Sequence, residues 1–194
     1  MRILIIKQGA LGDVIMATAL IAAIQRAHPG ATFSLLTTPA FAPLFEDWPA
    51  LEVQAFPRRG WAATVAMLRF IRRAHFDRVY DLQGNDRTGL LCALSGIRER
   101  VGNHTRYPYT HHPRDRWAGQ CHIFERMNEM LMAAGIAPAE PRPVLPCPPA
   151  AAADVAAFLA QHALSPRRFV LLHAGASPTR QDKCWPGFSE LAAR

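Results

Sequence analysis

Residues 5–24 read IIKQGALGDVIMATALIAAI. The stretch begins with a short apolar, β-branched run without polar alternation, which is typical of a strand buried on both faces. Two glycines, Gly9 and Gly12, interrupt it, and an apolar run with helical spacing follows. The predicted elements are a strand over residues 2–7, a turn over 9–12 and a helix over 13–27. A strand, a turn and a helix in this order begin the repeating unit of a parallel α/β sheet.

An acidic residue, Asp13, stands where the turn passes into the helix. Aspartate is a favoured helix N-cap, so a capping role explains its presence. Ligands of open α/β sheets bind at the carboxyl ends of the strands, where this turn lies, and Gly12 would let a ligand approach the backbone. A role in ligand binding is therefore equally open, and the two roles are compatible.

Strand and helix patterns alternate along the rest of the chain. Further strands are predicted over residues 32–37, 53–56, 78–82, 100–102 and, as a strand and turn, 168–177. Helices are predicted over residues 39–45, 61–74, 88–96, 122–134 and 150–163, and a last one begins at the WPGFSELAAR stretch. This alternation predicts an α/β fold with a doubly wound, Rossmann-like parallel sheet.

A proline-rich segment divides the pattern. Six of the twelve residues 138–149 are proline, as in an extended linker or edge strand. We therefore expect a first domain over residues 1–149. Residues 150–194 are expected to be a linker helix and the first strand–helix unit of a second domain. A single such unit cannot bury both faces of its strand, so we expect the 194-residue chain to be an incomplete fragment without measurable activity of its own.

The composition excludes several classes of protein. Half of the residues are hydrophobic and 19% are charged, as in a globular protein. The longest apolar run, residues 14–24, is too short to span a bilayer, and Lys7 interrupts the N-terminal apolar stretch before a signal peptide could form. A cytoplasmic location is the expectation. The four cysteines form no C-x-x-C pair, so neither a zinc site nor a redox pair is indicated.

The net charge of +7 is concentrated in two clusters. Residues 57–78 hold six arginines and one acidic residue, and residues 98–126 hold six arginines and four of the eight histidines. A basic surface suits nucleic acid, an anionic lipid surface or a phosphorylated substrate. No nucleic-acid-binding motif accompanies the clusters, and a solvated basic face explains either of them as well.

Two further motifs follow predicted strands. The stretch VYDLQGNDRTG, residues 79–89, brings Gln83, Asn85 and Arg87 to the same edge of the sheet as Asp13, where they are either binding residues or an ordinary polar loop. The stretch HAGASPTRQDKCWP, residues 173–186, has a glycine turn, hydroxyl side chains and a lysine before a helix. Small residues, hydroxyls and a point charge suit the binding of a diphosphate.

Taken together, three stretches resemble glycosyltransferase family 9, the ADP-heptose:lipopolysaccharide heptosyltransferases. They are RILIIKQGALGDVIMATALIAAI at residues 2–24, DRVYDLQGNDRTGLL at 77–91 with RVG at 100–102, and VLLHAGASPTRQDKCWP at 170–186. The resemblance implies the GT-B fold of two Rossmann-like domains, of which this chain has the first half. It also implies an inverting transfer of heptose from ADP-heptose to the inner core of lipopolysaccharide, without a metal or other cofactor.

The resemblance also implies roles for individual residues. The proposed catalytic base is Asp13, and Lys183 contacts the donor phosphates, with Ser177 and Thr179 as further donor-phosphate ligands. The expected acceptor-binding residues are Gly12, Arg58, Arg59, Gln83, Asn85, Arg87, Arg114 and Arg116. The implied acceptor is of the lipid A–Kdo type, at the inner face of the inner membrane, where a cytoplasmic enzyme would be peripheral. We expect a monomer that binds no nucleic acid.

Two other functions fit parts of the sequence. A non-catalytic α/β module that binds an anionic ligand, nucleic acid included, would explain the arginines, and its binding would fall steeply with salt. A nucleotide-dependent oxidoreductase is disfavoured, because G-x-x-G-D lacks the third glycine of the dinucleotide fingerprint.

Overall fold

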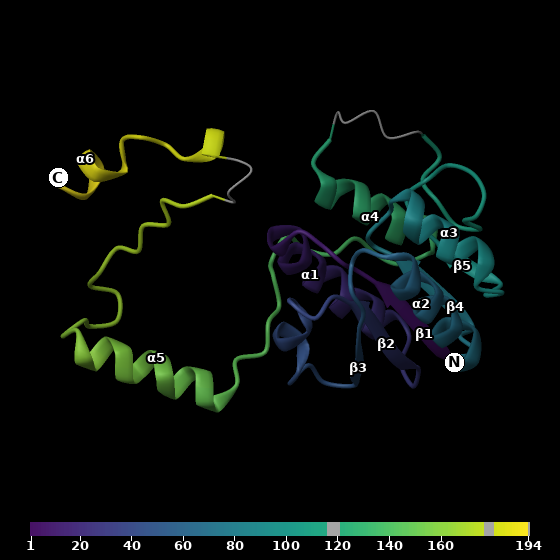
Figure 1. Cartoon of the computed structure of the whole chain (residues 1–194), viewed down its shortest axis with the longest axis horizontal. Helices are drawn as coiled ribbons and strands as arrows, with labels where there is room; N and C mark the ends of the chain where they lie inside the picture. The colour runs from purple at the N-terminus through teal and green to yellow at the C-terminus, as the bar shows by residue number, and fades with distance from the viewer. Residues whose placement is uncertain (116–120, 177–180, 194) are drawn as a thin grey trace. The chain divides into compact units, whose positions relative to one another are not determined.

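The computed structural model describes residues 1–115, 121–176 and 181–193. It divides the chain into two compact units, Met1–Pro146 and Cys147–Arg194 (Figure 1). The sequence placed a domain boundary after residue 149, and the acceptor and donor roles given there to the two parts stay predictions.

The first unit is built on a parallel sheet of five strands. These are β1 (Arg2–Ile6), β2 (Thr32–Thr37), β3 (Leu51–Ala55), β4 (Arg78–Asp81) and β5 (Glu99–Val101). They lie in the order β3-β2-β1-β4-β5, and all four pairings are parallel. Because β1 is central and enclosed on both faces, all of its residues after Arg2 are buried. The predicted fold class is confirmed.

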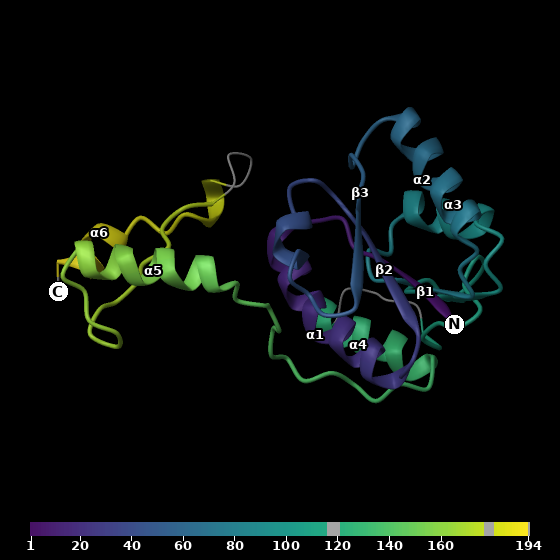
Figure 2. The same ribbon diagram turned by 90° about the horizontal axis from the view of Figure 1, so that it is seen from below.

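Helices cover both faces of this sheet, as Figure 2 shows from a second direction. On one face, α1 (Leu11–Ala27) and α4 (Ile123–Ala133) pack with the 3-10 turn η1 (Ala42–Phe45) against Ile3 and Ile5 of β1. On the other face, α2 (Trp61–Ala74) and α3 (Asp86–Leu94) pack against Leu4 and Ile6. No helix within the described ranges is long and apolar enough to cross a bilayer.

The proline-rich segment after α4 is fastened to the first unit by side chains of two helices. The Asn128 side chain donates to the carbonyl oxygen of Ala139 (3.0 Å) and accepts from its N–H (2.8 Å). Further along, the N–H of Val144 donates to Thr18 Oγ1 (2.9 Å). The segment is therefore anchored to α4 and α1 without being a strand.

The second unit has α5 (Pro149–Gln161), the 3-10 turn η2 (Gln181–Lys183) and the short helix α6 (Phe188–Ala192). Its described residues include no strand, so the strand predicted over residues 168–177 is wrong as far as residue 176. Its apolar side chains, such as Val170 and Leu171, are exposed. A strand needs a neighbour to accept and donate its backbone hydrogen bonds, and the described part of this unit supplies none.

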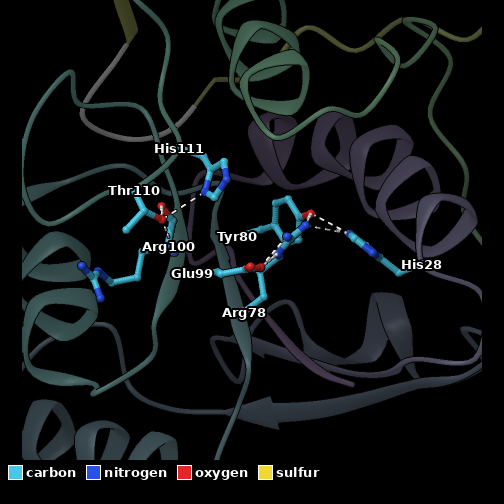
Figure 3. A network of polar contacts seen from close by, with 7 residues as sticks. All are labelled: His28, Arg78, Tyr80, Glu99, Arg100, Thr110 and His111. Atoms are coloured by element: carbon cyan, nitrogen blue, oxygen red, sulfur yellow. Dashed lines mark hydrogen bonds and ion pairs between the residues drawn. The ribbon is translucent and has the colours of Figure 1, made fainter.

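A polar network joins the end of α1 to the beginnings of β4 and β5 (Figure 3). His28 Nε2 and Tyr80 OH are 2.7 Å apart, and Arg78 donates to Tyr80 OH at 3.1 Å. Arg78 also forms an ion pair with Glu99. Burial lowers the pKa of His28, and the nearby Arg78 guanidinium lowers it further. Within this network the neutral imidazole is therefore the favoured form.

Candidate functional site

The turn between β1 and α1 leaves Asp13 free of the capping role that the sequence allowed. The N-cap of α1 is Ala10, and Asp13 lies in the first turn of the helix, partly exposed. Within the described ranges, its carboxylate has no hydrogen bond or ion pair. The backbone beside it is open, because a Cβ placed on Gly12 would have no atom within 4 Å. The capping interpretation is therefore wrong, and the carboxylate is available to a ligand.

A buried lysine lies behind this carboxylate. Lys7 is only 3% exposed, and its ammonium donates to the carbonyl oxygen of Leu82 at 3.1 Å, which links the ends of β1 and β4. Burial lowers the pKa of Lys7, while the charges of Asp13 and Asp81 act in the opposite direction. Lys7 thus supplies positive charge near Asp13. The sequence signal for it was a charged residue directly after a buried strand, which we did not assign to the site.

One of the expected acceptor-binding arginines, Arg58, approaches the same turn, and a second, Arg87, lies near Arg58. A Cβ on Gly9 would lie 2.8 Å from a guanidinium nitrogen of Arg58, so any side chain at Gly9 would push that guanidinium away. Arg87 donates to Thr64 Oγ1 at 3.0 Å, and burial together with the charge of Arg58 lowers its pKa. Arg58 and Arg87 therefore form a positive pair, of which Arg58 lies beside the β1–α1 turn.

The end of β4 holds the next part of the site. Gln83 Oε1 accepts from the N–H of Gln8 at 2.9 Å, so this expected site residue connects the two turns. Asp81, which the sequence did not single out, is buried. Its Oδ1 accepts from the N–H groups of Gln83 (3.1 Å) and Gly84 (3.0 Å), and Tyr109 donates its hydroxyl to Oδ2 at 2.5 Å. Asp81 therefore shapes the loop instead of facing a ligand.

A groove of about 1060 Å³ lies beside α3 and contains two more of the expected residues, Asn85 and Arg114. Asn85 is the N-cap of α3 and forms a capping box with Thr88, so its side-chain oxygen has a structural partner. The opposite wall comes from residues 103–108. Tyr109 fixes this wall, because its hydroxyl is bound to Asp81 at the end of β4.

The remaining expected residues are placed less specifically. Arg59 is exposed next to Arg58 in the chain, and Lys183 is exposed in η2 of the second unit. Arg116, Ser177 and Thr179 lie outside the described residues. Across the described ranges, no three His, Cys, Asp or Glu side chains gather as a metal site would require, and the metal-free reaction stays a prediction.

Comparison with known proteins gives a likeness of structure. No family model matches the sequence, and no curated protein is detectably similar to it. Among solved structures, a family 9 glycosyltransferase from Veillonella parvula matches 86% of this chain with a TM-score of 0.68 and 20% identity. The chain shares its fold. The resemblance inferred from the three motifs is thus confirmed for the fold.

Two heptosyltransferases of E. coli match as well. Heptosyltransferase II matches 86% of this chain (TM-score 0.62, 19% identity), and WaaC, solved with ADP-2-deoxy-2-fluoro heptose, matches 72% (TM-score 0.57, 22% identity). The matched part is 50–52% of the length of the V. parvula chain and the two E. coli chains. This chain therefore has the fold of about half of a GT-B glycosyltransferase.

Proposed function

We propose that this chain carries the base and the acceptor-binding residues of an inverting glycosyltransferase. The reaction moves heptose from ADP-heptose to the inner core of lipopolysaccharide. The observation that carries the proposal is the state of Asp13: a partly exposed carboxylate at the carboxyl edge of the sheet, without a capping role and next to open backbone. The likeness of fold to heptosyltransferases supports the choice of donor.

In the proposed reaction the acceptor hydroxyl attacks the anomeric carbon of the heptose. The new C–O bond forms as the bond to the diphosphate breaks, the electron pair leaves with the diphosphate, and Asp13 takes the hydroxyl proton. The reaction uses no metal or other cofactor.

The two substrates are proposed to meet different residues. Lys183, with Ser177 and Thr179, would offset the charge of the departing diphosphate. The acceptor, of the lipid A–Kdo type, carries anionic groups that suit arginine. The acceptor would contact the edge formed by Gly12 and Gln83 and the groove with Asn85 and Arg114. The further proposed contacts are basic: the exposed Arg59, the pair Arg58 and Arg87, and Arg116, which follows shortly after Arg114 in the chain. We propose a cytoplasmic monomer, peripheral at the inner membrane, that binds no nucleic acid.

The experiment that tests this function is Asp13→Asn in the natural gene product. Because Asn has nearly the same shape as Asp, we expect an unchanged melting temperature. Loss of the base should lower kcat for heptose transfer about 10²–10⁴-fold, with donor affinity unchanged. Asp47→Asn, which neutralises an exposed acid of the same unit, is the matched control and should transfer normally.

Normal turnover by Asp13→Asn would contradict the assignment of the base. Absence of transfer by the wild-type gene product, together with salt-sensitive binding of an anion, would favour the non-catalytic module instead.

A further inference from the structure

The helices α2 and α3 lie side by side and run in the same direction. Near their beginnings, Arg87 of α3 donates to Thr64 of α2 (3.0 Å), and near their ends Arg72 of α2 donates to the carbonyl oxygen of Leu94 (2.9 Å). Their inner sides pack on the sheet through Met67, Ile71 and Leu91. Their outer sides therefore form one continuous surface, which we call the outer face. Its larger exposed side chains are Trp61, Arg69, Arg72, Arg73, Leu90 and Leu94, with Tyr107 beside Ala93 and the acidic Asp86 at the start of α3.

The outer face exposes large apolar side chains. Trp61 is 77% exposed and Tyr107 75%, while Leu90 and Leu94, one turn apart on α3, are 47% and 43% exposed. Tyrosine and tryptophan are the residues that favour the boundary between lipid and water. An aromatic and aliphatic surface of this kind marks an interaction site when charged residues surround it.

The charges around these side chains are basic. Helix α2 carries Arg69, Arg72 and Arg73 and no acidic residue, and Asp86 is the only acid in the sequences of the two helices. The other exposed residues of α2, Ala62 and Ala66, are small and leave the arginines prominent. A helix with arginines beside an exposed tryptophan suits a membrane surface that contains anionic lipids.

We propose that the outer face docks on an anionic lipid bilayer, with the arginines at the headgroup phosphates and Trp61, Tyr107 and the two leucines at the boundary of the acyl chains. The inference rests on the proposed function, which gives the protein a lipid-linked acceptor to reach. Leu90 and Tyr107 of the outer face also line the groove beside α3, where that acceptor is proposed to bind. A lipid-linked acceptor can then pass its sugar from the membrane into the groove without leaving the bilayer.

The experiment is sedimentation with vesicles of phosphatidylcholine, with and without about a third of phosphatidylglycerol. The protein should bind the anionic vesicles far more strongly, and less so at high salt. Arg69→Gln with Arg73→Gln should lower the partition coefficient about thirtyfold, which corresponds to about 1 kcal/mol per arginine. Leu94→Gln with Trp61→Gln should weaken binding at unchanged net charge. Arg26→Gln with Met132→Gln, exposed on α1 and α4, is the matched control and should bind like wild type.

Equal binding to both kinds of vesicle, or equal loss in the control pair, would overturn the proposal. The proposal would also be overturned if the protein does not bind vesicles but binds a labelled RNA, and if this RNA binding is lost in Arg69→Gln with Arg73→Gln. Failure of the proposed function is a separate result. Asp13→Asn should bind vesicles normally but transfer heptose about 10²–10⁴-fold more slowly, whereas Arg69→Gln with Arg73→Gln should transfer normally to an acceptor dispersed in detergent.

Discussion

Two carboxylates at the same edge of the sheet differ in their surroundings. Asp81 is buried and accepts from two backbone N–H groups and the Tyr109 hydroxyl, whereas Asp13 is partly exposed. Burial raises the pKa of Asp81, and its hydrogen bonds, first that of Tyr109, oppose the rise. Asp81 thus holds loops in place, whereas the exposure of Asp13 is what its proposed role as base requires.

Tyr109→Phe tests this structural role. The change leaves Oδ2 of a buried carboxylate without its donor, so the free energy of unfolding should fall by about 1–3 kcal/mol. Tyr107→Phe is the matched control. Its side chain is exposed and its hydroxyl makes a long contact, 3.5 Å from the acceptor, so little change in stability is expected. Urea denaturation measures both, and equal losses would contradict the role of Asp81.

The sequence indicated some of these residues and not others. Asp13, Gln83 and Arg87 follow predicted strands closely, so the parallel topology alone brings them to one edge. Lys7 and Tyr109 depend on partners 75 and 28 residues away. Contacts of that range follow from packing, which no local pattern specifies.

The start of α3 combines a structural and a proposed binding role in one residue. Asn85 caps the helix through its side-chain oxygen, which accepts from the N–H of Thr88 at 3.0 Å. Asn85→Ala should therefore lower stability by about 1 kcal/mol, whereas Asn85→Asp should keep most of it because Asp caps about as well. Thermal unfolding compares the two. An equal loss in both variants would show that the capping bond contributes little.

Most elements of the first unit were predictable because each has a strong local pattern. The helix expected over residues 61–74 is found at those bounds, and the central strands differ by a residue or two at their ends. The strand expected over residues 168–177 is not formed as far as residue 176, because a strand is completed by its neighbours and the described residues of the second unit include no partner strand.

For the whole molecule, the buried core belongs to the first unit. Every described buried residue lies at or before Ala139. The network of His28, Tyr80 and Arg78 lies within this unit and ties α1 to the sheet. The protonation of His28 therefore bears on the stability of the whole first unit.

Because the pKa of His28 is lowered in the folded state, the unfolded chain takes up the proton first as the pH falls. The contribution of neutral His28 should be complete above the ordinary pKa of about 6.5 and lost as the pH drops through the lower folded value. Melting temperatures between pH 7.5 and 5 should therefore fall more steeply for wild type than for His28→Gln. Parallel slopes would show that His28 does not contribute.

The chain has only two lysines, and the structure treats them oppositely: Lys7 is buried between the ends of β1 and β4, and Lys183 is exposed. An amine-reactive reagent would therefore modify Lys183 and the N-terminal amine of the folded protein while sparing Lys7. Labelling at Lys7 becomes a marker for the opening of the central sheet. Labelling at Lys183, read in the same mass spectrum, becomes a marker for anything that covers the second unit.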